Sequence, residues 1–172
     1  MADVALPVRS LSPDSFAAYG TVIAPPDRDA DGSGPGWRWW AETALLDGDE
    51  RRWGVGYLDL EPVRPARFDW AERHMRTPEV VVPLGGPCLI YVAPAEHRDE
   101  PRRLPPLDRF EVFRVPRGLG VVLARGVWHG APLAADGPTA AMVLILEGTG
   151  RNDVTIVRFE DTPVTVDEDA SA

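Results

Sequence analysis

Short apolar runs, each ended by glycine, proline or charged residues, are the feature that most constrains how this chain folds. Proline and glycine are frequent, with 18 and 16 residues, as expected where many short strands are joined by turns. A single short helix is expected over residues 12–20, with Ser12 as N-cap, Pro13 in the first turn and Gly20 at its end. The pattern therefore predicts an all-β sandwich or barrel with a short N-terminal helix. The predicted strands are 21–23, 53–60, 68–74, 79–84, 88–92, 110–115, 120–123, 141–146 and 154–159.

The length and the local composition indicate one domain followed by a tail. With 172 residues the chain is long enough for a real core, and we assign residues 1–160 to one barrel domain. Residues 161–172 are acidic and small, and we expect them to be disordered. Trp37, Trp39 and Trp40 follow a loop rich in Asp, Gly and Pro. These tryptophans fit either a lid over a pocket or, as we expect, a contact between two copies in a homodimer.

Composition excludes several classes of function. The net charge of −9 argues against nucleic acid or an anionic membrane surface as a partner. No apolar run is long enough for a bilayer span and Met1–Val4 does not resemble a signal peptide, so we expect a cytoplasmic protein with a small-molecule substrate. All 18 basic residues are arginine, which excludes Schiff-base chemistry on a lysine. The single cysteine, Cys88, lies in an apolar run and is expected to be a buried structural thiol.

The stretch from Phe68 to Gly86 contains the clearest candidates for chemistry. Glu72 and His74 are two residues apart, so on a strand both side chains point to the same face, with Trp70 beside them. Glu79 follows, just before a run of three valines. Ionisable groups inside an apolar strand region are costly unless they have partners, so a function is favoured over a satisfied polar pair in the core.

These spacings resemble the two motifs of the cupin superfamily. Glu72-x-His74-x4-Glu79-x6-Gly86 is similar to the first motif, with Glu72 where a histidine normally stands. Gly118, Gly126 and His129 match the second motif, in which this chain has Ala124 for proline and Leu133 for asparagine. The resemblance implies a cupin-like double-stranded β-helix, or jelly-roll barrel, in which both motifs face one pocket.

A narrower resemblance is to the ureidoglycolate lyase family, which has this fold and acts in purine breakdown. The matching residues run from the opening S-P-D-S-F-A-A-Y-G to the R-N-D-V stretch, and include Glu72-Arg73-His74, Val81-Val82-Pro83-Leu84-Gly85-Gly86 and Val127-Trp128-His129. The resemblance implies a lyase that cleaves the C–N bond of a carbinolamine. It implies His129, Glu79 and Glu72 as catalytic residues. Strand alternation makes Arg125, which has the parity of His129, and Trp70, which has the parity of Glu72 and His74, candidates for substrate binding. Trp128, beside His129 in the Val-Trp-His motif, is a third candidate.

Glu79 is the departure that predicts a metal. Ureidoglycolate lyases generally have Gln at this position, whereas metal-binding cupins generally have Glu. Two carboxylates close together in a low-dielectric interior raise each other's pKa unless a cation lies between them. We therefore expect Glu72, His74, Glu79 and His129 to bind a divalent metal such as Ni, Mn, Fe or Zn. The alternative is a metal-free acid–base site with one protonated carboxylate.

Other departures predict an altered substrate. The lyases usually have an arginine in the strand before Glu-Arg-His, where this chain has Leu58 and Asp59, and an Asp-Arg pair where it has Leu146 and Glu147. A metal-dependent isomerase, dehydratase or cyclase of specialised metabolism is the main alternative. A cupin that binds a small ligand without turnover is a further one, although the four ionisable residues argue against it.

Overall fold

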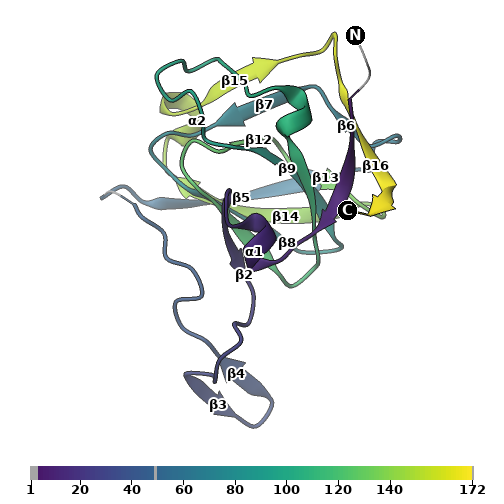
Figure 1. Ribbon diagram of the computed structural model, residues 1–172. Helices are drawn as coiled ribbons and strands as arrows, with labels where there is room; N and C mark the ends of the chain where they lie inside the picture. Colours follow the sequence, from purple (N-terminus) through teal and green to yellow (C-terminus); the bar gives the residue numbers. More distant parts are fainter. Residues whose placement is uncertain (1–3, 49, 172) are drawn as a thin grey trace.

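The computed structural model describes residues 4–48 and 50–171, whose strands form two facing sheets and a small separate hairpin (Figure 1). The larger sheet contains, in spatial order, β15 (Thr155–Arg158), β7 (Trp70–Arg73), β12 (Trp128–His129), β9 (Cys88–Ala93), β10 (Glu111–Val115), β1 (Ala5–Ser10), β16 (Val164–Ser171) and β6 (Arg67–Phe68), with β13 (Leu133–Ala134) also paired to β9. The smaller sheet contains β2 (Gly20–Ile23), β11 (Gly120–Leu123), β8 (Glu79–Pro83), β14 (Thr139–Leu146) and β5 (Trp53–Leu60). The curled sheets confirm the predicted all-β, barrel-like fold.

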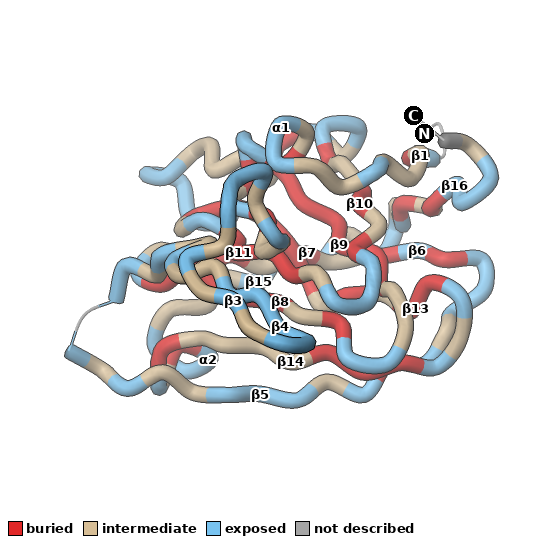
Figure 2. The backbone as a smooth tube through the Cα atoms, turned by 90° about the horizontal axis from the view of Figure 1, so that it is seen from below, coloured by how far each residue is buried: buried red, intermediate tan, exposed pale blue. Residues whose placement is uncertain are grey.

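Burial follows from the way the sheets are layered. Val81 and Val121 of the smaller sheet pack against Ile90 and Val92 of the larger sheet, so the main core lies between the two. The opposite face of the larger sheet has a second core, in which the rings of Phe68 and Tyr91 stack with centroids 3.8 Å apart. Strand β9 is therefore covered on both faces, which explains its unbroken apolar sequence (Figure 2).

The helices are short and lie at the edges of the barrel. Helix α1 (Pro13–Phe16) begins where Ser12 and Ser15 form a reciprocal capping box, and its Phe16 is fully buried. It confirms the predicted N-terminal helix, although a turn replaces the expected last part. The other helical segments are the 3-10 helix η1 (Leu107–Arg109) and α2 (Thr149–Asn152), which precedes β15.

Two expectations about strands need correction. The run predicted as one strand over 68–74 changes partner at Asp69, because β6 pairs with β16 whereas β7 pairs with β12 and β15. The tail predicted to be disordered over 161–172 instead contributes β16, which runs parallel to β1. Val164 and Val166 of β16 are buried in the second core. Burial of these alternating valines stabilises the strand although acidic residues follow them. The acidic residues continue β16 beside β1.

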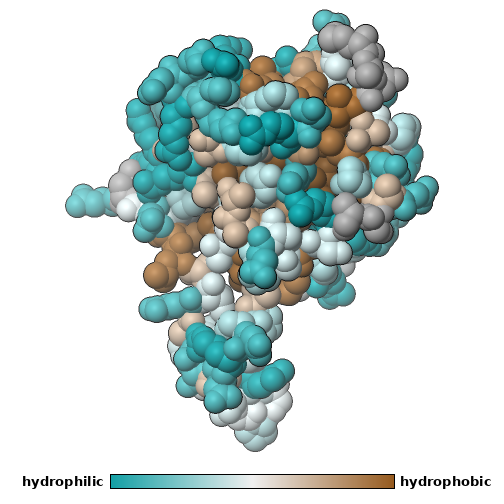
Figure 3. All heavy atoms as spheres, viewed as in Figure 1, coloured by the Kyte–Doolittle hydropathy of each residue, from teal (hydrophilic) through white to brown (hydrophobic). Residues whose placement is uncertain are grey.

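The hairpin of β3 (Gly32–Gly34) and β4 (Trp37–Trp39) projects from the barrel as an arm (Figures 1 and 3). Gly34 allows the ring of Trp37 to pack against the hairpin backbone, because a Cβ there would lie 2.6 Å from Nε1 of Trp37 and displace the ring. The arm is thus held together by its own packing, while Trp37 and Trp39 remain 54% and 61% exposed.

Two further predictions concern membranes and the cysteine. Among the described residues, no helix combines the length and the apolar character that crossing a bilayer requires. Cys88 is buried, as predicted, and burial raises the pKa of its thiol to about 12. At neutral pH the thiol is protonated and therefore a poor nucleophile.

Candidate active site

Strands β7, β8 and β12 bring four ionisable residues together between the two sheets. Glu72 lies opposite His129 in the register of β7 and β12, and the ligand atoms of Glu72, His74 and His129 lie within 4.8 Å of one another. Glu79 begins β8 in the facing sheet, with its Oε2 3.2 Å from Nε2 of His74 and 3.5 Å from Nε2 of His129. We call Glu72, His74, Glu79 and His129 the ionisable cluster.

Backbone carbonyls fix the tautomer of both histidines. Nδ1 of His74 lies 2.9 Å from the carbonyl oxygen of Asp153, and Nδ1 of His129 lies 2.9 Å from that of Val127. Because a carbonyl oxygen only accepts hydrogen bonds, each Nδ1 must carry a proton and donate it. In the neutral imidazoles each Nε2 then has a free lone pair, and both of these nitrogens face Glu79.

The electrostatics of the cluster are governed by the attraction between Glu79 and the imidazoles. Burial raises the pKa of Glu79, but attraction to the His129 and His74 imidazoles outweighs burial and lowers this pKa overall, to about 2. For His129, burial lowers the pKa, while attraction to Glu79 and the Val127 carbonyl outweigh burial and raise it overall. The cluster therefore favours an anionic Glu79 beside a cation, whether that cation is an imidazolium or a metal.

The donor set fits a divalent cation. Nε2 of His129 is buried and has no hydrogen-bond partner among the described residues; Oε2 of Glu79 lies 3.5 Å away, beyond the usual hydrogen-bond range. A free Nε2 lone pair with Nδ1–H held by a carbonyl is the usual arrangement of a metal-binding histidine. Two imidazole nitrogens with carboxylate oxygens suit Mn, Fe, Ni or Zn.

Three members of the cluster, Glu72, His74 and Glu79, line a hollow of about 360 Å³, whereas the buried His129 is not among its lining residues. The hollow lies where the barrel is open, between the edge strands β5 of the smaller sheet and β15 of the larger one. Most of its wall is aliphatic. The lining residues are Gly56, Tyr57, Leu58, Glu72, His74, Glu79, Ala131, Pro132, Val143, Ile145, Gly150, Val154 and Ile156.

The three side chains predicted to bind substrate do not line this hollow. Trp128 precedes His129 on β12, so it points to the opposite face, where it is fully buried in the second core. Arg125 lies in a turn, where strand alternation does not apply, and its guanidinium donates to the carbonyl of Asp47 at 2.7 Å. Trp70 is half-buried and is not among the lining residues.

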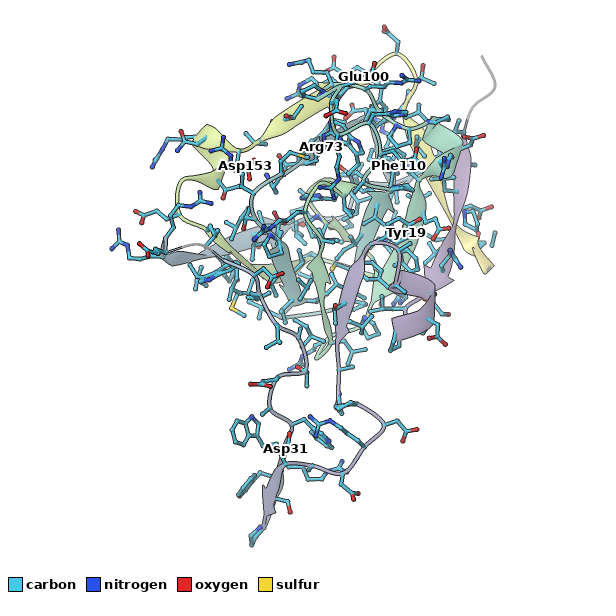
Figure 4. All side chains as sticks on the ribbon, turned by 60° about the vertical axis from the view of Figure 1, so that its left-hand side comes forward. Tyr19, Asp31, Arg73, Glu100, Phe110 and Asp153 are labelled. Carbon is cyan, nitrogen blue, oxygen red and sulfur yellow. The ribbon has the colours of Figure 1, made fainter. Side chains whose placement is uncertain are left out.

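Asp153 positions His74 in a way that the sequence did not reveal. Its carboxylate accepts hydrogen bonds from the backbone N–H groups of Met75 and Arg76, at 3.0 and 2.7 Å, while its carbonyl accepts from His74. Asp153 therefore ties the turn after β7 to the segment before β15 (Figure 4). The only sequence signal was its place in the R-N-D-V stretch.

Arg73 is the second residue that sequence reasoning missed. It is 1% exposed, on the opposite face of β7 from Glu72 and His74, and its guanidinium carbon lies 4.5 Å from the ring centroid of Trp128. Its guanidinium donates to the carbonyls of Glu96, His97 and Glu100, at 2.8, 3.0 and 3.2 Å (Figure 4). Arg73 thus fastens the loop after β9 to the back of the strand that carries the site.

Comparisons with known proteins identify the family to which the chain belongs. The sequence model of a family described as ureidoglycolate lyase matches residues 3–167. Ureidoglycolate lyase 2 of Rhizobium meliloti (strain 1021) is 31% identical over 155 residues, which cover 87% of this chain and 90% of that protein.

Solved structures give weaker likenesses that do not bear on function. The WlaRB TDP-quinovose 3,4-ketoisomerase of Campylobacter jejuni has a TM-score of 0.43 and 15% identity, covering 63% of this chain and 71% of that one. The 3,4-ketoisomerase QdtA of Thermoanaerobacterium thermosaccharolyticum has a TM-score of 0.42 and 16% identity, covering 59% and 64%.

Proposed function

The chain belongs to the ureidoglycolate lyase family, and we propose that it cleaves the C–N bond of a carbinolamine with a divalent cation held by its ionisable cluster. The observation that carries the proposal is the convergence of two imidazole Nε2 atoms on one oxygen of Glu79, at the wall of a hollow. Such a group of ionisable residues in an otherwise apolar hollow is typical of an active site.

The reaction requires a base, an acid and stabilisation of an oxygen. A base removes the proton from the carbinol hydroxyl, the oxygen's electron pair forms a C=O bond, and the C–N bond breaks. The nitrogen leaves with that bond's electron pair and takes up a proton. Glu79 and the two imidazoles suit the proton transfers, because Glu79 touches both Nε2 atoms and a proton can be held among them.

Glu72, His74 and His129 would hold the cation, with Glu79 as a fourth ligand or as the adjacent base. When bound, the cation supplies Lewis acidity toward the hydroxyl oxygen. The carbonyls of Asp153 and Val127 keep both imidazoles oriented toward it. A cation at this position would also offset the negative charges of Glu72 and Glu79, which would otherwise repel each other.

We expect only weak activity on ureidoglycolate itself. Its carboxylate needs a cationic partner, and none of the described residues that line the hollow is an arginine. Losing several charged contacts costs about 1–3 kcal/mol each. Aldehyde or glyoxylate release should be measured with ureidoglycolate and with neutral N-(1-hydroxyalkyl)amides.

The neutral compounds should be cleaved faster than ureidoglycolate in this assay. Turnover of ureidoglycolate in the usual range of about 1–1,000 s⁻¹ would contradict the altered substrate. Failure to cleave any compound, with folded and metal-loaded protein, would contradict the lyase proposal and favour the isomerase, dehydratase or ligand-binding alternatives.

We also propose that the chain forms a homodimer. Strand β5 is an unpaired edge on which Val55 and Tyr57 are 71% and 70% exposed, and the arm carries the exposed Trp37 and Trp39. Exposed apolar side chains at an unpaired edge are usually covered by a partner. Trp40 is less available, because its indole donates to the carbonyl of Arg28 at 3.0 Å.

Sedimentation should therefore give a dimer at micromolar concentration. Replacing both Trp37 and Trp39 with serine should shift it toward monomer without unfolding the barrel, because neither ring packs in the barrel core. A monomer from the unmodified chain would contradict the proposal.

A further inference from the structure

The hollow beside the ionisable cluster has two chemically different halves. The charged half consists of Glu72, His74 and Glu79, and the remaining wall is almost entirely apolar. Among the described lining residues, no further charged side chain offers a partner to a second polar group of a substrate. The larger aliphatic side chains of that wall are Leu58, Val143, Ile145, Val154 and Ile156.

The volume of the hollow is greater than the polar chemistry requires. At about 360 Å³ it falls within the range of about 300–1,000 Å³ that is usual for sites of drug-sized ligands. A hydroxyl and an amide nitrogen on one carbon occupy only the end beside the cluster. The rest of the space is bounded by apolar side chains, and filling it with apolar groups removes surface from water on both sides.

We propose that this wall is a subsite for an apolar substituent of the substrate. This proposal rests on the C–N cleavage proposed above. The substrate is then a neutral carbinolamine in which one fragment carries an aliphatic chain or ring of about four or more carbons. Each buried methylene contributes about 0.8 kcal/mol, equivalent to a roughly fourfold gain in affinity. Four methylenes amount to more than a hundredfold, enough to dominate selection among substrates.

Gly56 keeps this subsite open. It lies opposite Val143 in the register of β5 and β14, and residues directly opposite each other in an antiparallel pair share a face. Because Val143 lines the hollow, a side chain at position 56 would enter it as well. A Cβ there would lie 3.7 Å from the Val143 carbonyl oxygen and 3.8 Å from its Cβ, which is ordinary contact. The backbone therefore accepts a Cβ at this position, and valine is a residue that suits a strand.

The test measures binding separately from turnover. The probes are 2-hydroxyalkanamides from glycolamide to 2-hydroxyoctanamide, which have a neutral hydroxyl and amide beside an apolar chain of increasing length. Their dissociation constants are measured by calorimetry on the metal-loaded protein. Affinity should rise roughly fourfold per added methylene and then level off once the hollow is filled. An affinity that does not change with chain length would overturn the subsite.

Gly56→Val is the decisive variant, and Gly137→Val is its matched control. Gly137 lies outside the hollow, and a Cβ there would have nothing within 4 Å. Gly56→Val should retain the affinity for glycolamide and lose at least tenfold for the longest probes, whereas Gly137→Val should match the parent. An unchanged chain-length dependence in Gly56→Val would overturn the assignment. Thermal unfolding and metal content verify that both variants fold.

Ile145→Ala provides a second route if Gly56→Val does not fold. This variant removes apolar wall and enlarges the hollow, so long probes should bind more weakly while the affinity for glycolamide is unchanged. Equal losses of affinity for all probes would count against the subsite. These results are separable from the proposed reaction. Affinity that depends on chain length, without cleavage of any carbinolamine, would support the subsite and contradict the lyase proposal. Cleavage with affinities that do not depend on chain length would support the lyase proposal and contradict the subsite.

Discussion

Replacing His129 with alanine is expected to lower turnover by about 100- to 10,000-fold, which is the usual contribution of a positioned acid–base group. Its Nε2 lies 3.5 Å from Glu79 Oε2 and is grouped with donor atoms of Glu72 and His74. The variant thus loses both a proton carrier and a ligand, so its metal content should fall as well. Steady-state turnover with the best carbinolamine substrate and elemental analysis measure the two effects.

The matched control for His129→Ala is His97→Asn. His97 lies in the loop after β9 with a positive φ of 51°, a conformation that asparagine tolerates. The hydrogen bond from Arg73 goes to the carbonyl oxygen of His97, which the substitution retains. We expect His97→Asn to retain activity and metal. Equal losses in the two variants, or full activity of His129→Ala, would contradict the role of His129.

Replacing Arg73 with leucine is expected to destabilise the fold by about 3–5 kcal/mol, the scale of breaking a buried charged network. The change leaves three carbonyl oxygens without their donor and removes the cation from the face of Trp128. For a chain of this size the melting temperature should fall by roughly 10 °C. Thermal and denaturant unfolding measure the loss.

Arg52→Leu is the control for the loss of an arginine. Arg52 pairs with Glu147 at 2.8 Å, but its side chain is 84% exposed, so the pair is worth at most about 1 kcal/mol. A fall in stability as small for Arg73→Leu as for Arg52→Leu would show that Arg73 does not hold the loop to the sheet.

Strand alternation predicted the parts of the site that lie on regular strands. Glu72 and His74 belong to one face because they are two residues apart, and the paired motifs suggested that His129 would face them. Regular alternation does not extend into turns, so it gives the wrong direction for Arg125, whose guanidinium donates to the carbonyl of Asp47. The expectation for Trp128 rests on its place beside His129 in the motif, but neighbouring residues on a strand point to opposite faces, and Trp128 lies in the second core.

Features that depend on distant backbone could not be predicted from the sequence. Arg73 pairs with no carboxylate in the described structure and donates instead to three backbone carbonyls. Every residue type has a backbone carbonyl, so the sequence does not indicate these partners. Asp153 acts through backbone N–H groups 77 and 78 positions away. The partner of β16 is β1, at the other end of the chain, so an acidic tail read locally looked disordered.

The metal content of protein purified without chelator or added metal is the most direct test of the account. We expect close to one divalent ion per chain, reduced in Glu79→Gln, and loss of lyase activity in EDTA that returns when metal is restored. Metal well below one ion per chain, together with undiminished activity in EDTA, would contradict the metal site and leave the ionisable cluster as a metal-free acid–base set.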